Sequence, residues 1–587
     1  MTTDKRTHTA ASSEARRTLL VLGAGLMQRP AIEAARSLDC QVVVVDGNHQ
    51  ALCVPLADQF FPLDLKDKEG IKELALSLQS QGRLHGVFTA GTDFSATVSY
   101  VGEACGFSVH SYQAACNASD KILMRRCFQG ASVASPAFLE VASGTGADSI
   151  NQVAAAFPAF GEDCPLVVKP VDNMGGRGCR LVHCRQDLEL ALEEAKRNSR
   201  SGRAIVEEYM AGPEFSIDAL VYNGTVTICG FADRHIFFPP YFIEMGHTIP
   251  TSLSQTNPQG YLDLLATFVR GIKSLGLTCG AAKADIKLTP KGAMVGEIAA
   301  RLSGGYMSGW TYPYSSDLFL TRQAAAIALG LEPEELLSRR QPVAGLPQDL
   351  PFAVYQIPSL RHCAERAWIS IPGRVKAVHG LSKEQNLAVP CEGVQDVLVR
   401  SQPGDSVSFP RNNVEKCGNI IAVDSTWQGA ATKAQAAVKT ILLELEPCQR
   451  VTDDFFDLPL PQLRQPCQRG QAAHEESFPP AAFILPPPLE QELDRYLSSN
   501  REAFDATRSL LQQLPPCLEP WLDSLVDWNH RSLGETISLA QGILDAQGDS
   551  VGSCGVSLSL VRLWQACILG GVQGILYMIA SAPRRND

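Results

Sequence analysis

Two acidic side chains near the middle of the chain have the type and spacing to bind a divalent cation. Asp285 lies in the strand-like run 283–288, and Glu297 lies in a second run, 293–301. The Thr-Pro-Lys-Gly sequence between the runs predicts a turn, and in the resulting hairpin the two carboxylates can face each other. Facing carboxylates repel unless a cation lies between them, and a magnesium ion that bridges phosphates is a suitable cation. Arg301 follows on the same face as Glu297, where it could stabilise a developing phosphoryl charge.

A glycine-rich segment earlier in the chain could bind phosphate. The apolar run 166–168 leads into Lys169 and Pro170, and a second strand-like run follows at 179–182. The residues between the runs include Gly175, Gly176, Arg177 and Gly178. Glycines have no Cβ, so their backbone N–H groups can approach phosphate oxygens, and the lysine adds a positive charge. An ordinary hairpin turn explains the same glycines, so this segment alone leaves both interpretations open.

Further charged positions lie on either side of this glycine loop. Lys121 follows Asp120, which can cap a helix, although an exposed surface lysine is the alternative. Downstream, a strand-like run ends in four residues that could surround a nucleoside: Glu207, Glu208, Tyr209 and Met210. Glu214 follows them after a Gly-Pro turn. Carboxylates here can accept hydrogen bonds from ribose hydroxyls, and the backbone can pair with an adenine edge, although a polar β-turn is the alternative.

These pieces occur together in an order that resembles the ATP-grasp enzymes, and the resemblance covers about residues 18–447. It implies an ATP site formed by Lys121, Lys169, Gly175, Gly176, Arg177, Gly178, Glu207, Glu208, Tyr209, Met210 and Glu214. It implies a metal site for Mg²⁺, or alternatively Mn²⁺, formed by Asp285 and Glu297. The catalytic residues that it implies are Arg301 and Lys169. Family members often have Asn two residues after the metal-binding Glu, and Ala299 stands there in this sequence, so one metal ligand departs from the pattern.

A second segment narrows the resemblance. The sequence Glu-Met-Gly-His at 244–247, with Pro250 nearby, is similar to L-amino-acid ligases and dipeptide synthetases. The similarity implies a substrate site formed by Glu244, His247, Arg301, Ser303, Gly304 and Gly305. In that site Glu244 would pair with a substrate ammonium, and Arg301 with the turn after it would grip a carboxylate or an acyl phosphate. A loop that only packs over the cleft is the alternative for Glu244 and His247.

The implied activity is that of an ATP-dependent carboxylate–amine ligase. Such an enzyme forms an amide or peptide bond through an acyl phosphate and releases ADP and phosphate. The expected partners are small-molecule carboxylate and amine substrates, with neither nucleic acid nor membrane, and a homodimer is left open. One alternative is another ATP-grasp chemistry in nucleotide synthesis, by a carboxylase or a glycinamide-type ligase. Another is an ATP-binding regulatory protein without turnover, which Ala299 makes conceivable.

The elements that must position these residues follow from the strand and helix signals. Residues 18–112 alternate β-branched runs with helices, which predicts a Rossmann-like domain with a parallel sheet. Gly23, Gly25 and Asp46 resemble part of a dinucleotide fingerprint, but Gln28 replaces the third glycine. We therefore expect this domain to border a substrate cleft through its 91–93 loop rather than to bind a dinucleotide.

The predicted fold class is α/β: a Rossmann-like pre-ATP-grasp domain, an ATP-grasp fold of two α+β subdomains, a mixed α/β lid and a helical C-terminal extension. The predicted boundaries are a disordered N-terminus at 1–17 and domains or linkers at 18–112, 113–345, 346–447, 448–485 and 486–587. In the lid we expect strands at 352–357, 373–378, 394–400 and 418–423, and a helix over 430–445. The apolar run 556–580 includes Arg562 and Gln565, so a buried helix is favoured over a membrane span.

The composition limits the class of protein. The chain has 587 residues, with 45% hydrophobic and 19% charged, as in a protein with several buried cores. A net charge of −11 argues against a surface whose main role is to bind nucleic acid. The 18 cysteines show neither a Cys-x-x-Cys pair nor zinc spacing. A reduced, cytoplasmic chain is the simplest explanation.

Overall fold

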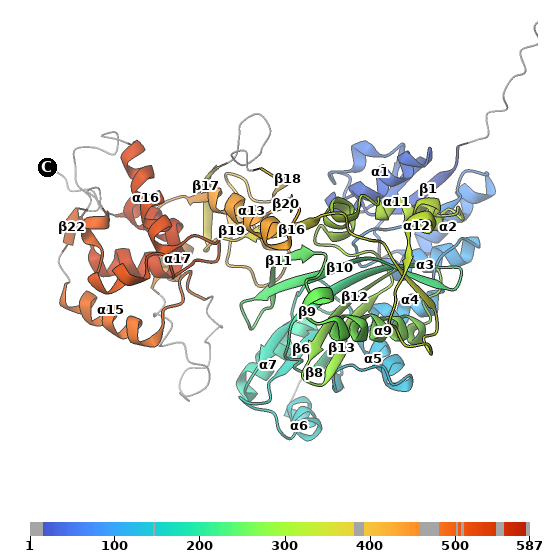
Figure 1. Cartoon of the computed structure of the whole chain (residues 1–587), viewed down its shortest axis with the longest axis horizontal. Helices are drawn as coiled ribbons and strands as arrows, with labels where there is room; N and C mark the ends of the chain where they lie inside the picture. The colour runs from blue at the N-terminus through green and yellow to red at the C-terminus, as the bar shows by residue number, and fades with distance from the viewer. Residues whose placement is uncertain are drawn as a thin grey trace, which may run out of the picture.

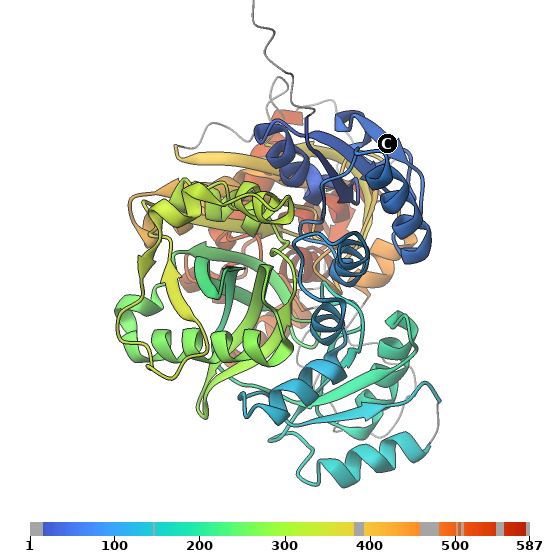
Figure 2. The ribbon, with the colours of Figure 1, turned by 90° about the vertical axis from the view of Figure 1, so that its right-hand side faces the viewer.

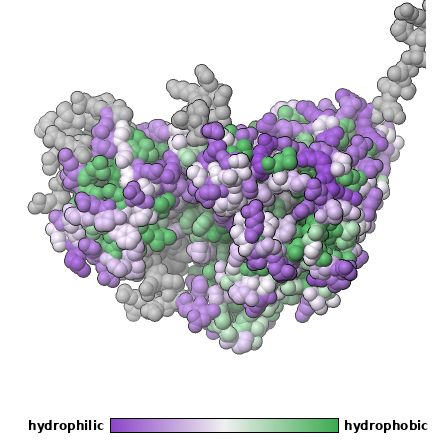
Figure 3. Space-filling view, in the orientation of Figure 1, coloured by the Kyte–Doolittle hydropathy of each residue, from purple (hydrophilic) through white to green (hydrophobic). Residues whose placement is uncertain are grey.

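The computed structural model describes residues 16–144, 147–380, 392–457, 480–500, 503–505, 510–547 and 557–582 (Figure 1). Sheets with covering helices form most of this part, and helices dominate its C-terminal end, red in Figure 1. The predicted α/β class with a helical extension is confirmed. The predicted disordered segment 1–17 lies, except for its last two residues, outside the described residues. Polar and apolar residues are interspersed over the face seen in Figure 3.

The N-terminal domain is built on a parallel sheet with the strand order β3-β2-β1-β4. Alternate residues of β1 (Thr18–Leu22) pack into two different hydrophobic clusters, so the sheet is buried on both faces, as its uninterrupted apolar runs predict. The other elements are β2 (Gln41–Val45), β3 (Gln59–Phe61), β4 (Gly86–Phe88), α1 (Arg29–Ser37), α2 (Lys68–Ser80) and α3 (Ser95–Cys105).

Side chains of the protein itself fill the turn that carries the incomplete glycine fingerprint of this domain. Gln28 is fully buried, and its Oε1 accepts the backbone N–H of Ala90 at 2.9 Å. A Cβ built on Gly23 would lie 3.1 Å from Cγ of Gln28. Asp46 accepts the backbone N–H of Ala24 at 2.7 Å. Because these side chains occupy the turn, its glycine and carboxylate stabilise the fold.

A small antiparallel sheet, ordered β5-β8-β6-β7, carries the glycine loop. This unit, turquoise in Figure 2, extends away from the larger sheet. The glycine loop connects β6 to β7, which pair antiparallel as predicted. Its elements are β5 (Phe138–Val141), α6 (Ala147–Ala156), β6 (Leu166–Pro170), β7 (Arg180–Val182), α7 (Arg185–Asn198) and β8 (Ala204–Glu208). It is joined to the N-terminal domain by α4 (Tyr112–Ser119) and α5 (Lys121–Gly130).

A large sheet of the described residues crosses the predicted boundary between ATP-grasp domain and lid. Its main path is β13-β12-β9-β10-β11-β16-β20-β18; off this path, β15 pairs with β10, and β14 pairs with β15. The strands before that boundary are β9 (Glu214–Tyr222), β10 (Thr225–Phe237), β11 (Ile243–Ile249), β12 (Gly280–Thr289), β13 (Gly292–Ala299) and β14 (Gln341–Pro342). Those after it are β15 (Ala353–Gln356), β16 (His362–Trp368), β18 (Val394–Val399) and β20 (Gly418–Asp424). The helices beside them include α9 (Pro258–Leu275) and α11 (Leu320–Ala328).

The helix predicted over 430–445 is too long. The structure has α13 (Trp427–Thr440) followed by a strand, β21 (Leu442–Leu445), which pairs with β17 (Gly373–His379). The apolar run 441–445 fits a helix or a strand by composition. Pairing with β17 satisfies its backbone groups and buries three of its leucines.

The C-terminal helices share one hydrophobic core with the lid and with β11. This core includes Tyr241, Ile243 and Met245 beside residues from 480–582. Asn529 exchanges two hydrogen bonds with the backbone of Ile369, each of 3.1 Å. The helices are α14 (Arg450–Phe456), α15 (Pro487–Ser499), α16 (Leu533–Gln547) and α17 (Leu560–Ser581). Part of the predicted linker 448–485 is therefore helical, and residues 458–479 lie outside the described ones.

One helix within the described ranges, α17, is long and apolar enough to cross a membrane. Of its most apolar window, 89% is buried inside the protein, in agreement with the predicted buried helix. The described thiols are mostly free, but Cys184 is disulfide-bonded, so the prediction of a fully reduced chain is wrong at that position. The cytoplasmic location stays a prediction.

Candidate active site

Where β9 pairs with β12, one face of the large sheet carries polar side chains and the other carries apolar ones. On β9, Glu214, Ser216 and Asp218 alternate with Phe215 and Ile217, which are buried in the core beneath. On β12, Lys283, Asp285 and Lys287 lie opposite the three polar residues of β9 in the strand register. The period of two in the sequence thus places charged side chains of adjacent strands side by side on one surface.

The predicted carboxylate pair is formed. Asp285 lies directly opposite Glu297 in the β12–β13 hairpin, as the sequence predicts. Glu297 lies 3.4 Å from Nζ of Lys121, and both line a small pocket with Arg301, Ala299 and residues of the N-terminal domain. Burial raises the pKa of Glu297, but Lys121, Lys283 and Arg301 outweigh it and lower this pKa to about 2. Glu297 is therefore an anion at neutral pH.

The residues present fit a magnesium ion that takes part of its ligands from phosphate. The described residues contain no group of three or more His, Cys, Asp or Glu side chains that could hold a metal alone. Asp285 and Glu297 nevertheless supply two facing carboxylates, and Oδ1 of Asp285 lies 2.6 Å from Nη1 of Arg234. One or two carboxylates with phosphate oxygens and water make a common magnesium site. Ala299, at the position where the family pattern often has Asn, lines the pocket that contains Glu297.

The glycine loop has the backbone conformation that its sequence predicts. Gly175, Gly176 and Gly178 have φ values of 70°, 79° and 65°, which favour glycine. Lys121, in the first turn of α5 after the capping Asp120, donates to the backbone oxygen of Asn173 at 2.8 Å. Lys121 thus holds the start of the glycine loop and borders the carboxylate pocket.

Glu207 lies between two cations instead of facing an open nucleotide pocket. Its Oε1 is 2.8 Å from Nε of Arg125, and its Oε2 is 2.7 Å from Nζ of Lys169. Glu207 and Arg125 are both almost fully buried. Burial alone would lower the pKa of Lys169, but the neighbouring Glu207 raises it by more. The net pKa is above the usual value, so the lysine stays charged. Arg125, to which the sequence assigned no role at the site, lies 82 residues before Glu207.

The remaining residues expected around adenine make contacts of their own. The N–H of Glu208 donates to the backbone oxygen of Ala137 at 3.0 Å. The backbone oxygen of Met210 accepts from Nζ of Lys287 at 3.1 Å. Tyr209 stacks on Phe242 with ring centroids 6.1 Å apart. These residues lie together at the end of β8, but their roles toward a nucleotide stay predictions.

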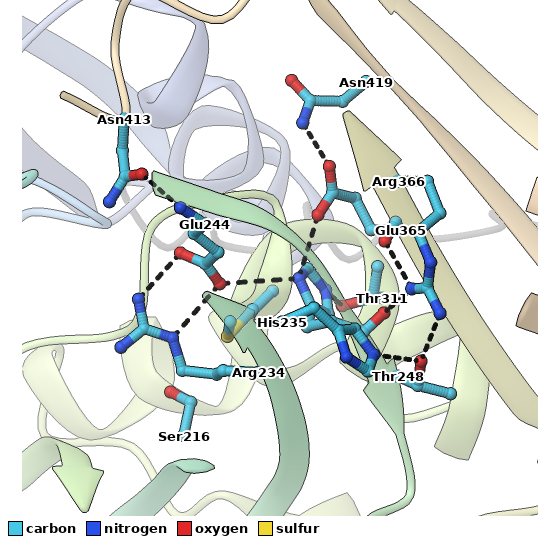
Figure 4. A network of polar contacts seen from close by, with 12 residues as sticks. Ser216, Arg234, His235, Glu244, Thr248, Thr311, Glu365, Arg366, Asn413 and Asn419 are labelled. Atoms are coloured by element: carbon cyan, nitrogen blue, oxygen red, sulfur yellow. Dashed lines mark hydrogen bonds and ion pairs between the residues drawn. The ribbon is translucent and has the colours of Figure 1, made fainter. Parts of the chain in front are cut away.

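Arg234, which the sequence did not single out, connects three of the predicted site residues. Its Nη1 is 2.5 Å from Glu214 and 2.6 Å from Asp285, and its Nη2 is 2.8 Å from Glu244. Figure 4 shows its two bonds to Glu244. An arginine within a run such as Ala-Asp-Arg-His carries no motif, so only the register of β10 against β9 and β11 reveals it.

Glu244 and His247 belong to one buried network, with Nδ1 of His247 3.9 Å from Oε1 of Glu244. Figure 4 shows Glu244 and Glu365 in this network. Burial raises the pKa of Glu244, but Arg234 outweighs this effect and lowers it to about 2. His247 is fully buried, with Nδ1 3.2 Å from Glu365 and Nε2 2.8 Å from the hydroxyl of Thr311. Because both ring nitrogens have polar neighbours inside the protein, the geometry gives no support to His247 as a general base.

The turn after Arg301 meets the N-terminal domain. A Cβ on Gly91 would lie 3.4 Å from Cα of Gly304, so the 91–93 loop borders the turn. That this loop lines a substrate cleft stays a prediction. The N–H of Ser303 donates to Oδ2 of Asp218 at 2.8 Å. Burial raises the pKa of Asp218 to about 6, and its Oδ1 accepts no hydrogen bond.

Comparison with known proteins identifies two parts of the chain. A family model described as the ATP-grasp domain matches residues 162–309, and one described as L-amino acid ligase C-terminal domain 2 matches residues 367–446. The first match contains the glycine loop, Arg234, Glu244 and the hairpin of Asp285. The second contains most of the predicted lid.

Individual relatives are distant. An uncharacterized protein from Sinorhizobium fredii is 26% identical over 387 residues, which is 64% of this chain and 71% of that protein. Carnosine synthase 1 from Gallus gallus is 25% identical over 354 residues, 56% of this chain. The chain spans only 37% of that synthase.

Solved structures agree on the fold. The L-amino acid ligase from Bacillus licheniformis aligns with a TM-score of 0.58 at 18% identity, over 73% of this chain and 99% of that enzyme. At this identity the likeness concerns the fold alone. Together with the two domain matches, it shows that the chain contains an ATP-grasp domain followed by an L-amino acid ligase C-terminal domain.

Proposed function

We propose that the protein is an ATP-dependent carboxylate–amine ligase that forms an amide or peptide bond. The observation that carries the proposal is the convergence of Lys121, Glu297 and Arg301 on one pocket beside the glycine loop and Asp285. These groups have the charges that a phosphoryl transfer from ATP to a carboxylate requires.

The cationic side chains act on the phosphates. Lys169 is held charged beside Glu207, and Lys121 lies within 3.4 Å of Glu297, so both lysines are oriented before a nucleotide arrives. The N–H groups of the glycine loop add donors that can surround phosphate oxygens without a Cβ in the way. Catalysis of this kind depends on positioning and charge neutralisation more than on covalent participation by the protein.

The reaction has two steps whose atoms balance. An oxygen of the substrate carboxylate attacks the γ-phosphorus of ATP, the bond from this phosphorus to the β,γ-bridging oxygen breaks, and ADP leaves. The amine nitrogen then attacks the acyl carbon. The bond between the acyl carbon and the phosphate oxygen breaks, phosphate leaves, and the nitrogen loses a proton. Arg301, fixed at the rim of the pocket, would stabilise charge on the transferring group.

Magnesium would be held by Asp285 and Glu297. When bound, it neutralises phosphate charge during transfer. The side chains around it also have roles of their own: Lys283 pairs with Asp285, and Lys121 pairs with Glu297. These ion pairs hold both carboxylates in place.

Amino acids are the first substrates to test. The relatives include a carnosine synthase and an L-amino acid ligase, and Glu244 offers an ionised carboxylate that suits a substrate ammonium. Arg234 already engages Glu244, so an incoming ammonium would share this carboxylate with it.

A screen of ADP release over pairs of amino acids and small carboxylates tests the proposal. We expect ADP only when a carboxylate and an amine are both present, and its loss in Lys169→Ala and Glu297→Ala proteins that keep the wild-type circular dichroism. Arg126→Ala, on the exposed side of α5, is the control and should keep the activity.

Other outcomes would reject the proposal. ADP release that requires bicarbonate would point to a carboxylase. Nucleotide binding without ADP in every mixture would indicate a regulatory protein. Activity that survives both substitutions would show that the pocket is elsewhere.

A further inference from the structure

A loop of the lid, residues 409–416, touches both the glycine loop and the strand that carries Glu244. Its polar residues brace the loop itself: Asn412 donates to Glu415 at 2.6 Å and accepts the N–H of Val414 at 2.9 Å. At its first residue, Phe409 packs against Trp528 of the C-terminal helices, with ring centroids 5.3 Å apart. These contacts hold the loop in one conformation. They therefore fix the position of Asn413, which follows Asn412.

Asn413 makes two contacts with different parts of the site. Its backbone N–H donates to the backbone oxygen of Gly175 in the glycine loop at 3.0 Å. Its side-chain Oδ1 accepts the backbone N–H of Glu244 at 2.8 Å, as Figure 4 shows. A single residue thus bridges the segment expected to close on phosphate and the residue expected to bind the substrate ammonium.

The bridge is reinforced on the other side of Glu244. Nζ of Lys416, which is 6% exposed, donates to the backbone oxygen of Glu244 at 2.7 Å. Both backbone groups of Glu244 are therefore bonded to side chains of the 409–416 loop. In an ordinary strand these groups would pair with a neighbouring strand, but the β10–β11 register shifts at His235–Ile236, directly opposite Glu244.

We infer that Asn413 is a positioning residue that couples closure of the glycine loop to the placement of Glu244. Phosphate binding orders the glycine loop, this fixes the oxygen of Gly175, and Asn413 then holds the N–H of Glu244 more rigidly. Because coupling between two binding sites is reciprocal, a ligand on Glu244 tightens nucleotide binding in return. The inference rests on the proposed function for the identity of the two ligands.

Hydrogen exchange with a nucleotide probe tests the coupling without a known substrate. The exchange of the 243–248 peptide is measured by mass spectrometry with and without the magnesium complex of a non-hydrolysable ATP analogue. In the wild-type protein we expect the analogue to slow the exchange of one amide in this peptide about five-fold, the effect of one net hydrogen bond of about 1 kcal/mol. In Asn413→Ala this slowing should disappear because the acceptor for the N–H of Glu244 is lost, while the analogue still binds within about five-fold of wild-type affinity.

Two variants separate the bond from the loop. Asn413→Asp keeps an acceptor for the N–H of Glu244 and should retain the slowing. Val414→Ala changes the neighbouring side chain, which lies 3.7 Å from a Cβ built on Gly175, but leaves both bonds of Asn413, and it should behave as wild type. Loss of the slowing in Val414→Ala would show that loop packing, not Asn413, carries the effect.

The remaining outcomes separate this inference from the proposed function. Nucleotide-dependent slowing that persists in Asn413→Ala overturns the inference alone. Binding of the analogue to the wild-type protein without any slowing in the 243–248 peptide also overturns it and leaves the ligase proposal intact. A wild-type protein that does not bind the analogue overturns both.

Discussion

Two buried carboxylates, Glu207 and Glu244, are each paired with an arginine, but their surroundings differ in charge. Glu207 is one anion between two cations, Arg125 and Lys169. Glu244 shares its arginine, Arg234, with Glu214 and Asp285. The first cluster leaves positive charge for phosphates. The second concentrates carboxylates that suit a metal ion and an ammonium, and its ion pairs must rearrange when such ligands arrive.

The comparison predicts the largest effect at Glu207. Glu207→Ala leaves Arg125 buried without a carboxylate, so we expect a loss of about 3–5 kcal/mol in the free energy of unfolding. Arg126→Ala, which removes an exposed pair with Glu140 from the same helix, should cost at most about 1 kcal/mol. Denaturant unfolding followed by circular dichroism measures both. Equal losses in the two variants would mean that the buried Glu207 cluster contributes no more to stability than an exposed ion pair, which contradicts the prediction.

A smaller and pH-dependent effect is expected at Arg234. Arg234→Met leaves three carboxylates with fewer cations, at a cost of about 2–3 kcal/mol at pH 7. Without Arg234, Glu244 loses the main cause of its lowered pKa and binds a proton more readily in the folded state, so the cost should shrink as the pH falls from 7 to 5. The cost of Glu207→Ala should not shrink in this range, because it leaves cations unpaired. Unfolding curves at the two pH values that showed the same trend for both variants would remove the contrast between the clusters.

The smallest effect is expected at Asp218, a buried carboxyl group on the same face of the sheet. The pKa of Asp218 is raised to about 6, so its contribution to stability is fully present below about pH 4 and is lost as the pH rises through 6. Between pH 5 and 7.5 this loss amounts to about 1 kcal/mol. Asp218→Asn keeps an acceptor for Ser303 and should remove the loss, whereas Asp349→Asn at an exposed position should not. Parallel pH profiles for wild type and Asp218→Asn would contradict the raised pKa.

The local motifs could be predicted from the sequence because each depends on neighbours in the chain. The turn between β12 and β13 fixes the register that brings Asp285 opposite Glu297. The glycines between β6 and β7 have the positive φ values that their residue type allows. The capping Asp120 places Lys121 in the first turn of α5.

The contacts between distant segments could not be predicted in this way. Arg125 meets Glu207 only because α5 packs beside β8, and Arg234 meets Glu214 and Glu244 only through strand pairing. The sequence therefore indicated which carboxylates matter but not their partners. The prediction of a helix up to residue 445 was wrong for the same reason, because pairing with β17 decides the conformation of β21.

The continuous large sheet has a mechanical consequence. β11 is hydrogen-bonded to β16 from Gly246 opposite Arg366 to Ile249 opposite Cys363, and β16 continues the sheet into β20. The lid cannot swing away from the strand of Glu244 without breaking this ladder. The small β5–β8 unit forms a separate sheet and is joined to the large sheet by short connections such as residues 209–213. If the cleft opens, we therefore expect the glycine-loop unit to move and the lid strands β16 and β20 to stay beside Glu244.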